Sequence, residues 1–378
     1  MSALAQETSS HAPDEQDRRE LRDTVRRALL AVAPVETTLK LMEADRPWDE
    51  AGWRRLADEV GLPALTVPQE YDGQGFGRVE EGIVLEELGR VLYPGPLVPG
   101  AVLAGGALRL AAAAGSTTAA RWLPAIAEGT LSAALVLPGS AEDVRLTGTG
   151  AGATVDGRAA YVIGGIDADL FVLVGHGPEG PVLTAVERGP AVSVEPVSVL
   201  DLTRPLAHVR FAAAPAVPLV EGPDTDLVHA VRNLARSALT SESAGAARAA
   251  LEITVAYAQT RVQFGRLIGS FQAVRHRLAD LLAEVEIASE AAEAAAAIPD
   301  SELATTDADI TVATAVGMVI DTFTTVAEQT VQLHGGIGFT WEHPAHMYLK
   351  RAKATELLLG GAERSRAELF DALQEASA

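Results

Sequence analysis

The chain has 378 residues, 48% of them hydrophobic, so it is long enough for two or three folded domains and too apolar to be disordered. It contains no cysteine, which excludes disulfides, thiol catalysis and cysteine-ligated metal sites. The formal net charge of −21 opposes binding to nucleic acid or to anionic membranes, and an anionic ligand would need local arginines.

The first 15 residues are polar, and we expect them to be disordered. They lack a basic start followed by an apolar run, so we expect no secretory signal. No stretch offers the roughly 20 unbroken apolar residues that a membrane helix needs. The expected location is therefore the cytoplasm.

Residues 16–128 show mainly helical periodicity. Apolar residues fall on one helical face at Leu21, Val25 and Leu29, and the segment VEEGIVLEELGRVLY repeats this spacing. A loop rich in Pro and Gly, GLPALTVPQEYDGQGFG, separates the two segments. We predict an N-terminal α-helical domain.

Residues 129–222 have a different character. Six short runs rich in β-forming residues are separated by Gly, Pro and Asp: LSAALVLP, AYVIGG, DLFVLVG, PVLTAVE, AVSVEPVSV and LAHVRFA. Short strands at intervals of about ten residues are typical of a compact β-barrel or sandwich.

Residues 223–378 return to helical periodicity. One helix is predicted from Leu227 to Arg261, and Val312, Val316 and Val319 begin a strict 4-3 alternation of apolar residues. That spacing is typical of the buried seam of a helical bundle. The predicted fold class is therefore α+β, with an N-terminal helical domain, a middle β-barrel or sandwich and a C-terminal four-helix bundle.

Two long motifs of the C-terminal region, YAQTRVQFGRLIGSFQAVRHRLADL and VQLHGGIGFTWEHPAHMYLKRAK, resemble signature segments of the acyl-CoA dehydrogenase family. The N-terminal segments LPALTVPQEYDGQGFG and LEELGRVLYPGPLVP resemble the same family's first domain, so the likeness covers nearly the whole chain. The resemblance implies a role in fatty acid metabolism. It implies FAD-dependent α,β-desaturation of an acyl thioester, with hydride transfer to FAD and electrons passing to an electron-transferring flavoprotein.

The first motif resembles a segment that contacts FAD. The resemblance implies that Arg261 pairs with the pyrophosphate, that Phe264 packs near the adenine and that Gln272 hydrogen-bonds the cofactor. A guanidinium suits a diphosphate because it can donate two parallel hydrogen bonds, and Gly265 allows close approach of the backbone. On the residues alone, Arg261 could equally be a solvated arginine at a helix end.

The second motif carries three glycines after a long helix, which by itself is more typical of a helix end followed by a loop. The resemblance implies that Gln332, Gly335 and Gly336 reach across a subunit interface to the neighbour's FAD. We therefore expect a homodimer or tetramer, or a heterotetramer with a second family member. We expect His334 to pack in the core, because no metal-ligand set accompanies it.

Two further assignments follow from the resemblance. Arg236 resembles the arginine that contacts bound acyl-CoA, with a surface arginine as the alternative. In LVLPGSAEDVRLTG, Gly139 and Ser140 correspond to a loop whose hydroxyls contact the flavin, although the loop is shortened here.

The carboxylate base of the family is absent from this sequence. The family places a glutamate at one of two positions, which here are Leu359 and Ala235, and neither side chain can accept a proton. Glu242 lies seven residues beyond Ala235 on the same helix and near the same face, which makes it a candidate for a relocated base. The alternative is that Glu242 shapes a pocket or meets solvent.

Several functions remain open at this point. In the first, the chain is an active enzyme whose catalytic base lies at a different position. In the second, the chain is the non-catalytic subunit of a heteromeric acyl-CoA dehydrogenase. A third possibility is recruitment to biosynthetic chemistry on an acyl group bound to a carrier protein instead of CoA. A flavin-free binding or scaffold protein is the fourth, although the flavin motifs argue against it.

Overall fold

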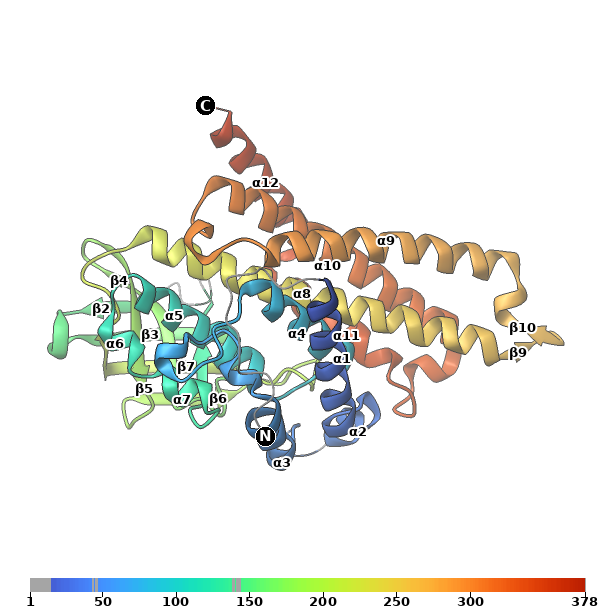
Figure 1. Cartoon of the computed structure of the whole chain (residues 1–378), viewed down its shortest axis with the longest axis horizontal. Coiled ribbons are helices and arrows are strands. Elements are labelled where there is room, and N and C mark those ends of the chain that lie inside the picture. The colour runs from blue at the N-terminus through green and yellow to red at the C-terminus, as the bar shows by residue number, and fades with distance from the viewer. Residues whose placement is uncertain (1–14, 43, 45–46, 138–139, 141–143, 378) are drawn as a thin grey trace.

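The computed structural model of the chain describes residues 15–42, 44, 47–137, 140 and 144–377. Helices of the N-terminal region and a curled sheet form one side of the molecule, and a bundle of long helices extends to the other (Figure 1). This order confirms the predicted α+β architecture. The expected disorder of residues 1–15 lies outside the described residues, except for Glu15, which begins the first helix.

The N-terminal region consists of seven α-helices and short helical turns. The α-helices are α1 (Glu15–Val32), α2 (Val35–Leu41), α3 (Glu50–Arg55), α4 (Arg78–Arg90), α5 (Gly105–Ala113), α6 (Thr117–Ala120) and α7 (Leu123–Ala127). The turns include η1 (Leu56–Val60), η2 (Leu62–Ala64), η3 (Gln69–Tyr71) and η4 (Leu97–Ala104). The side chain of Asp49 accepts a hydrogen bond from the Gly52 amide at 2.7 Å and so caps the start of α3.

Helix α4 is buried on nearly all sides, whereas its sequence predicted a single buried face. Even its glutamates are covered, because α1 packs on one side of α4 and the long helix α8 (Thr225–Thr260) packs on another. Arg26 of α1 donates two hydrogen bonds of 2.8 Å to the carboxylate of Glu87, which satisfies that buried charge.

Two glycines allow α4 and α8 to cross at backbone contact. A Cβ atom on Gly89 would lie 1.8 Å from the carbonyl oxygen of Glu242, and one on Gly245 would lie 1.9 Å from the carbonyl oxygen of Glu86. Any larger residue would force the helices apart. The crossing therefore sets where Glu242 lies relative to the N-terminal helices.

The middle region is one curled sheet of eight strands. The strands are β1 (Ala133–Leu135), β2 (Arg145–Thr147), β3 (Thr154–Ile163), β4 (Leu170–Gly177), β5 (Gly180–Glu187), β6 (Val192–Pro196), β7 (Leu206–Pro215) and β8 (Val217–Pro218). Their order is β6-β7-β3-β2-β4-β5-β8, with β1 pairing in parallel with β4. Each of the six predicted runs contains one strand. Strands β2 and β8 were not predicted, because two or three residues carry no readable alternation.

The C-terminal region is helical, as predicted. Its α-helices are α8, α9 (Gln272–Ala296), α10 (Thr306–His334), α11 (Ala345–Leu359) and α12 (Gly361–Ala376). The predicted seam of α10 is buried from Val312 to Thr330. Asp224 caps the start of α8, and Thr305 caps the start of α10, each through a hydrogen bond from a backbone amide.

One helical stretch, Thr306–Phe339, is long and apolar enough to cross a membrane by length and composition alone. It consists of α10 and the following turn η8 (Gly335–Phe339), and 61% of its most apolar window is buried inside the protein. The sequence criterion of roughly 20 unbroken apolar residues is not met here, because threonines and Asp321 interrupt the run. The burial is that of a bundle's core helix.

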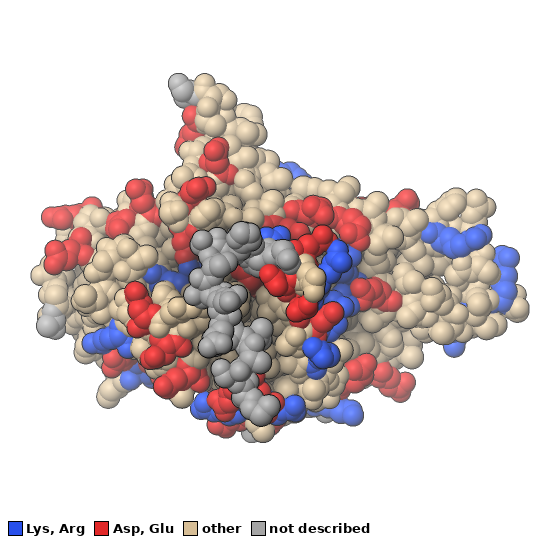
Figure 2. Space-filling view, viewed as in Figure 1, with Lys and Arg blue, Asp and Glu red and all other residues tan. Residues whose placement is uncertain are grey.

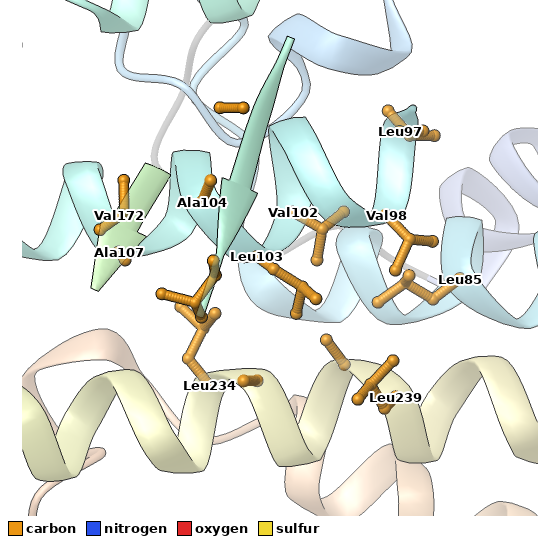
Figure 3. Packing of buried hydrophobic residues seen from close by; sticks show 14 of the residues in the cluster. Leu85, Leu97, Val98, Val102, Leu103, Ala104, Ala107, Val172, Leu234 and Leu239 are labelled. Atoms are coloured by element: carbon orange, nitrogen blue, oxygen red, sulfur yellow. The ribbon is translucent and has the colours of Figure 1, made fainter. Parts of the chain in front are cut away.

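The largest hydrophobic cluster joins all three regions. Leu97, Val98 and Leu103 of η4 pack in this cluster with Leu85 of α4 and with Leu234 and Leu239 of α8, as Figure 3 shows. Val172 of β4 belongs to the same cluster and brings the sheet against it (Figure 3). The three regions therefore share this cluster, and a second cluster lies within the sheet region alone.

Candidate functional site

A two-stranded hairpin projects from the end of the helical bundle (Figure 1). Strands β9 (Val262–Gln263) and β10 (Arg266–Leu267) are joined by Phe264 and Gly265, whose φ angles of 51° and 73° are both left-handed. Two-residue hairpin turns require this geometry, but it is strained for an aromatic residue. Phe264 is nevertheless 91% exposed, and its edge-to-face contact with Phe271, at 6.2 Å between ring centroids, covers little of its ring. A strained, exposed aromatic at a projecting tip is typical of a binding surface.

The hairpin is basic in a strongly acidic protein. Arg261, Arg266 and Arg275 are exposed there, and Lys and Arg side chains gather at this tip of the molecule in Figure 2. Gln272, also exposed, is the first residue of α9, whose N-terminal end favours negative charge. The predicted contacts Arg261, Phe264 and Gln272 therefore lie on one short segment that can receive a diphosphate.

The glycine-rich turn follows α10 directly. Gly335 has φ 65° and ψ −140°, a conformation that only glycine adopts readily. Apart from adjacent residues in the chain, no atom of the described residues would lie within 4 Å of a Cβ atom on Gly335 or Gly336, and Gln332 is exposed beside them. The backbone at this turn is therefore open to a flat group or to another chain.

A stack of three rings connects the two motifs. The ring of His334 lies between Tyr257 and His343, with centroid distances of 4.4 and 4.3 Å, and its Nδ1 donates to the Thr330 carbonyl at 2.7 Å. Burial lowers the pKa of His334, so it is neutral at pH 7. His334 packs, as expected. Because Tyr257 lies one helical turn before Arg261, the stack holds the hairpin and the turn at the same end of the bundle.

The loop around Ser140, which the resemblance predicted to contact the flavin, is described only in part. The amide of Ser140 donates to the Leu137 carbonyl, and its carbonyl accepts from the Ala160 amide, both at 2.9 Å. Gly139 lies outside the described residues. Ser140 is therefore tied to the end of β1 and to β3 through its backbone.

Next to Ala160 lies a residue that the sequence analysis missed. Tyr161 has φ 56°, is half exposed, and contacts the ring of His208 at 5.2 Å between centroids. It lies where the pairing of β3 with β7 shifts register, and such bulges commonly redirect a side chain near a functional site. In the sequence, Tyr161 looks like any aromatic residue of a strand, so no signal distinguished it.

Arg236 is largely covered by the C-terminal helix, which contradicts the alternative of an arginine on an exposed face. Its side chain is 11% exposed, and it forms an ion pair of 2.6 Å with Glu368 and a hydrogen bond of 3.3 Å with Ser365. Both partners belong to α12. Burial lowers the pKa of Arg236, and Glu368 opposes that shift. In this structure its guanidinium is bound to the C-terminal helix.

The two usual base positions are apolar and buried. Leu359 is 8% exposed and Ala235 is 1% exposed, and both belong to the large hydrophobic cluster that joins the three regions. Neither position presents a proton acceptor.

Glu242 is buried, at 2% exposure, and both of its carboxylate oxygens are occupied. Oε1 accepts from Nη1 of Arg351 at 2.6 Å, and Oε2 accepts from Nη2 of Arg204. A general base needs a carboxylate oxygen directed at the substrate proton, whereas each oxygen of Glu242 is directed at an arginine. The suggested solvent contact is also wrong, but Glu242 does line a cavity, as the other alternative predicted.

An aspartate completes this group of charges. Asp201 accepts from Nε of Arg351 at 2.5 Å. Burial alone would raise the pKa of Asp201, but Arg351 and Arg204 hold it below its usual value. Sequence analysis missed Asp201, Arg204 and Arg351, because residues so far apart in the chain give no local signal.

Family models match both helical regions of the chain. Residues 15–130 match the model described as "Acyl-CoA dehydrogenase, N-terminal domain", and residues 227–373 match "Acyl-CoA dehydrogenase, C-terminal domain".

The chain is also similar to curated proteins of Mycobacterium tuberculosis. It is 36% identical to acyl-CoA dehydrogenase IpdE2, over 91% of this chain and 93% of that protein. It is 33% identical to acyl-CoA dehydrogenase FadE27, over 88% and 90% of the two chains.

Among solved structures, two superpose with a TM-score of 0.86. One is described as a variant of the Tcur3481-Tcur3483 steroid ACAD, at 29% identity over 96% of this chain and 99% of that one. The other is the ChsE4-ChsE5 complex from Mycobacterium tuberculosis, at 30% identity over 96% and 98%.

Proposed function

Because the chain belongs to the acyl-CoA dehydrogenase family, we propose that it is the subunit without a base in a two-component enzyme that desaturates an acyl-CoA thioester. One observation carries this proposal. Leu359 and Ala235 are buried and apolar at the two base positions, while both oxygens of Glu242 are held by arginines. The partner subunit then supplies the carboxylate that removes the proton from the α-carbon.

Family members are generally FAD-dependent, and FAD when bound accepts the hydride from the β-carbon. The exposed arginine, the projecting aromatic and the open glycine backbone all fit the nucleotide end of that cofactor. In this proposal Arg261 and Gln272 hold the diphosphate, and the turn at Gly336 reaches across the subunit interface to the neighbour's FAD. These residues bind and orient, and none of them moves a proton. Electrons then pass to an electron-transferring flavoprotein.

Two observations favour a pair of different chains over a pair of identical ones. The similar structures at 29% and 30% identity are described by paired names, Tcur3481-Tcur3483 and ChsE4-ChsE5. A homodimer built only from this chain would contain no glutamate at either base position.

The test is to co-express the chain with a family member that has glutamate at the position matching Leu359. We expect a stable complex that contains flavin and is bleached by an acyl-CoA, whereas the chain alone is not bleached. Replacing the partner's glutamate by glutamine should abolish bleaching and leave the flavin bound. Bleaching by the isolated chain with its own flavin would overturn the proposal.

A further inference from the structure

A network of buried charges joins the sheet region to the helical bundle. The loop between β6 and β7 contributes Asp201, Thr203 and Arg204, while α8 contributes Glu242 and α11 contributes Arg351. Every one of these side chains is buried. Two cations and two anions balance, so the group is neutral as a whole.

The two arginines of the network donate hydrogen bonds to all of its other members. Arg351 uses all three of its nitrogens, donating to Asp201, to Glu242 at 2.6 Å, and to the carbonyl of Thr203 at 3.1 Å. Arg204 donates to Glu242 and, at 3.0 Å, to the hydroxyl of Thr355. Thr355 lies one helical turn before Leu359, the last residue of α11. Arg204 therefore contacts α11 near the C-terminal end of that helix.

Packing beside this joint leaves a gap. A cavity of about 40 Å³ lies next to the network and is lined by Ile163 and Gly164 of the sheet region together with Arg204, Glu242 and Arg351. Where packing is incomplete, apolar contacts leave the relative position of two elements loosely determined. Charge-assisted hydrogen bonds have strict geometry and can determine it.

We infer that Arg204 is a positioning device: held by its ion pair with Glu242 of α8 and donating to Thr355 of α11, it fixes α11 and the turn at Gly360 against the loop between β6 and β7. Buried ion pairs can often be replaced by apolar side chains without loss of stability, so stability alone does not require this one. Glu242 then acts through Arg204 and Arg351 and touches no reacting atom. That this placement also serves the flavin site rests on the proposed function.

The inference can be tested on the isolated chain by a distance measurement. Because the chain has no cysteine, two can be added cleanly, by Glu195→Cys on β6 and Leu357→Cys on α11, both exposed positions. Spin labels at these positions report the separation of sheet and helix by double electron–electron resonance. Arg204→Met combined with Glu242→Met removes the pair and leaves Arg351 bound to Asp201.

We expect one narrow distance distribution in the labelled parent, and a shifted or broadened distribution in the double variant although it remains folded. The control is Arg248→Met with Glu286→Met, an exposed pair between α8 and α9, which should leave the distribution unchanged. An unchanged distribution in the Arg204/Glu242 variant would overturn the inference.

If that double variant fails to fold, Arg204→Lys replaces it. Lysine keeps the charge but cannot reach Glu242 and Thr355 together, so the distribution should broaden, and an unchanged one overturns the inference. Neither measurement needs flavin or a partner, so its outcome is independent of the proposed function. In the co-expressed complex, loss of flavin from the double variant supports the link to the cofactor, and full retention refutes that link.

Discussion

The carboxylate of Glu242 lies between two buried guanidinium groups, so its first role is to stabilise the folded structure. Glu242→Gln would leave Arg204 and Arg351 facing a single anion, Asp201. Removing one partner of a buried pair typically costs about 3–5 kcal/mol, so we expect a loss of that order in the free energy of unfolding. Chemical denaturation followed by circular dichroism measures it.

The matched control is Glu286→Gln, which breaks an exposed pair with Arg248 and should cost less than about 1 kcal/mol. A Glu242→Gln protein with parental stability that had lost bleaching by substrate would restore Glu242 as a base.

Glu86 provides a prediction about pH. Burial raises its pKa to about 7, Arg22 opposes this shift, and Glu293 and Glu87 add to it. The folded pKa of Glu86 lies above the unfolded value. The contribution of this group to the free energy of unfolding is therefore fully present below pH 4.5 and is lost as pH rises through about 7. The loss is on the order of 3 kcal/mol above pH 8. Glu86→Gln should therefore raise the Tm relative to the parent at pH 8, and by less at pH 5.

Scanning calorimetry at both pH values checks this difference, with Glu284→Gln, an exposed carboxylate of α9, as the control. An equal effect of Glu86→Gln at both pH values would contradict the shift.

Individual residues were the hardest part to predict from sequence. The absence of a carboxylate at Leu359 and Ala235 could be predicted, because the residue types are given by the sequence itself. The roles of Arg204 and Arg351 could not, because their partners come from distant elements. Tyr161 was missed because a bulge and a left-handed φ are properties of the folded sheet.

The crossing of α4 and α8 depends on two glycines. Gly89→Ala or Gly245→Ala places a methyl group within 2 Å of a backbone carbonyl oxygen, which no rotamer change relieves. We expect each to destabilise the protein by about 3 kcal/mol or more, as measured by thermal unfolding. Gly317→Ala on α10 is the control: its nearest neighbour would be 3.8 Å away, and helix propensity should then add about 0.5–1 kcal/mol. Tolerance of alanine at Gly89 would show that the helices can separate.

The hairpin gives a prediction that separates binding from stability. Arg261 is exposed, and no ion pair of its side chain occurs within the described part of the chain. Arg261→Ala should therefore leave the Tm unchanged but lower the flavin content of the co-expressed complex, measured by absorbance per protein. The control is Arg188→Ala, which makes the same change of charge at an exposed arginine of the sheet region. It should not lower the flavin content. Full flavin content in Arg261→Ala would remove this residue from the site.

Elements were predicted well where periodicity is long. The seam of α10 repeats over five turns, and its spacing allowed no other assignment. The burial of α4 was not predicted. Helical periodicity identifies one apolar face and assigns charged residues to solvent, whereas most of the charged residues of α4 are buried too. The hairpin of two-residue strands also left no pattern, although its sequence was singled out by family resemblance.

The molecule as a whole carries a net charge of −21, and much of the face in Figure 2 is acidic. Self-repulsion of this size lowers the stability of the compact state, and salt screens it. We expect the Tm to rise between roughly 0.02 M and roughly 0.5 M NaCl. Sodium sulfate at equal ionic strength separates screening from ion-specific effects. A fall in Tm would mean that the ion pairs outweigh the repulsion.

The helix crossing also has a consequence for synthesis of the chain. Arg78 of α4 bonds to Ser237 of α8, although 159 residues separate them. At about 5–20 residues per second, α4 leaves the ribosome roughly 8–30 seconds before the helix that covers it. During that interval Leu85 and Leu88, which are fully buried later, lack their cover from α8 and can be bound by chaperones. The N-terminal helices are therefore a region that matures only after translation has passed α8, and a truncated product that ends earlier is a candidate for aggregation.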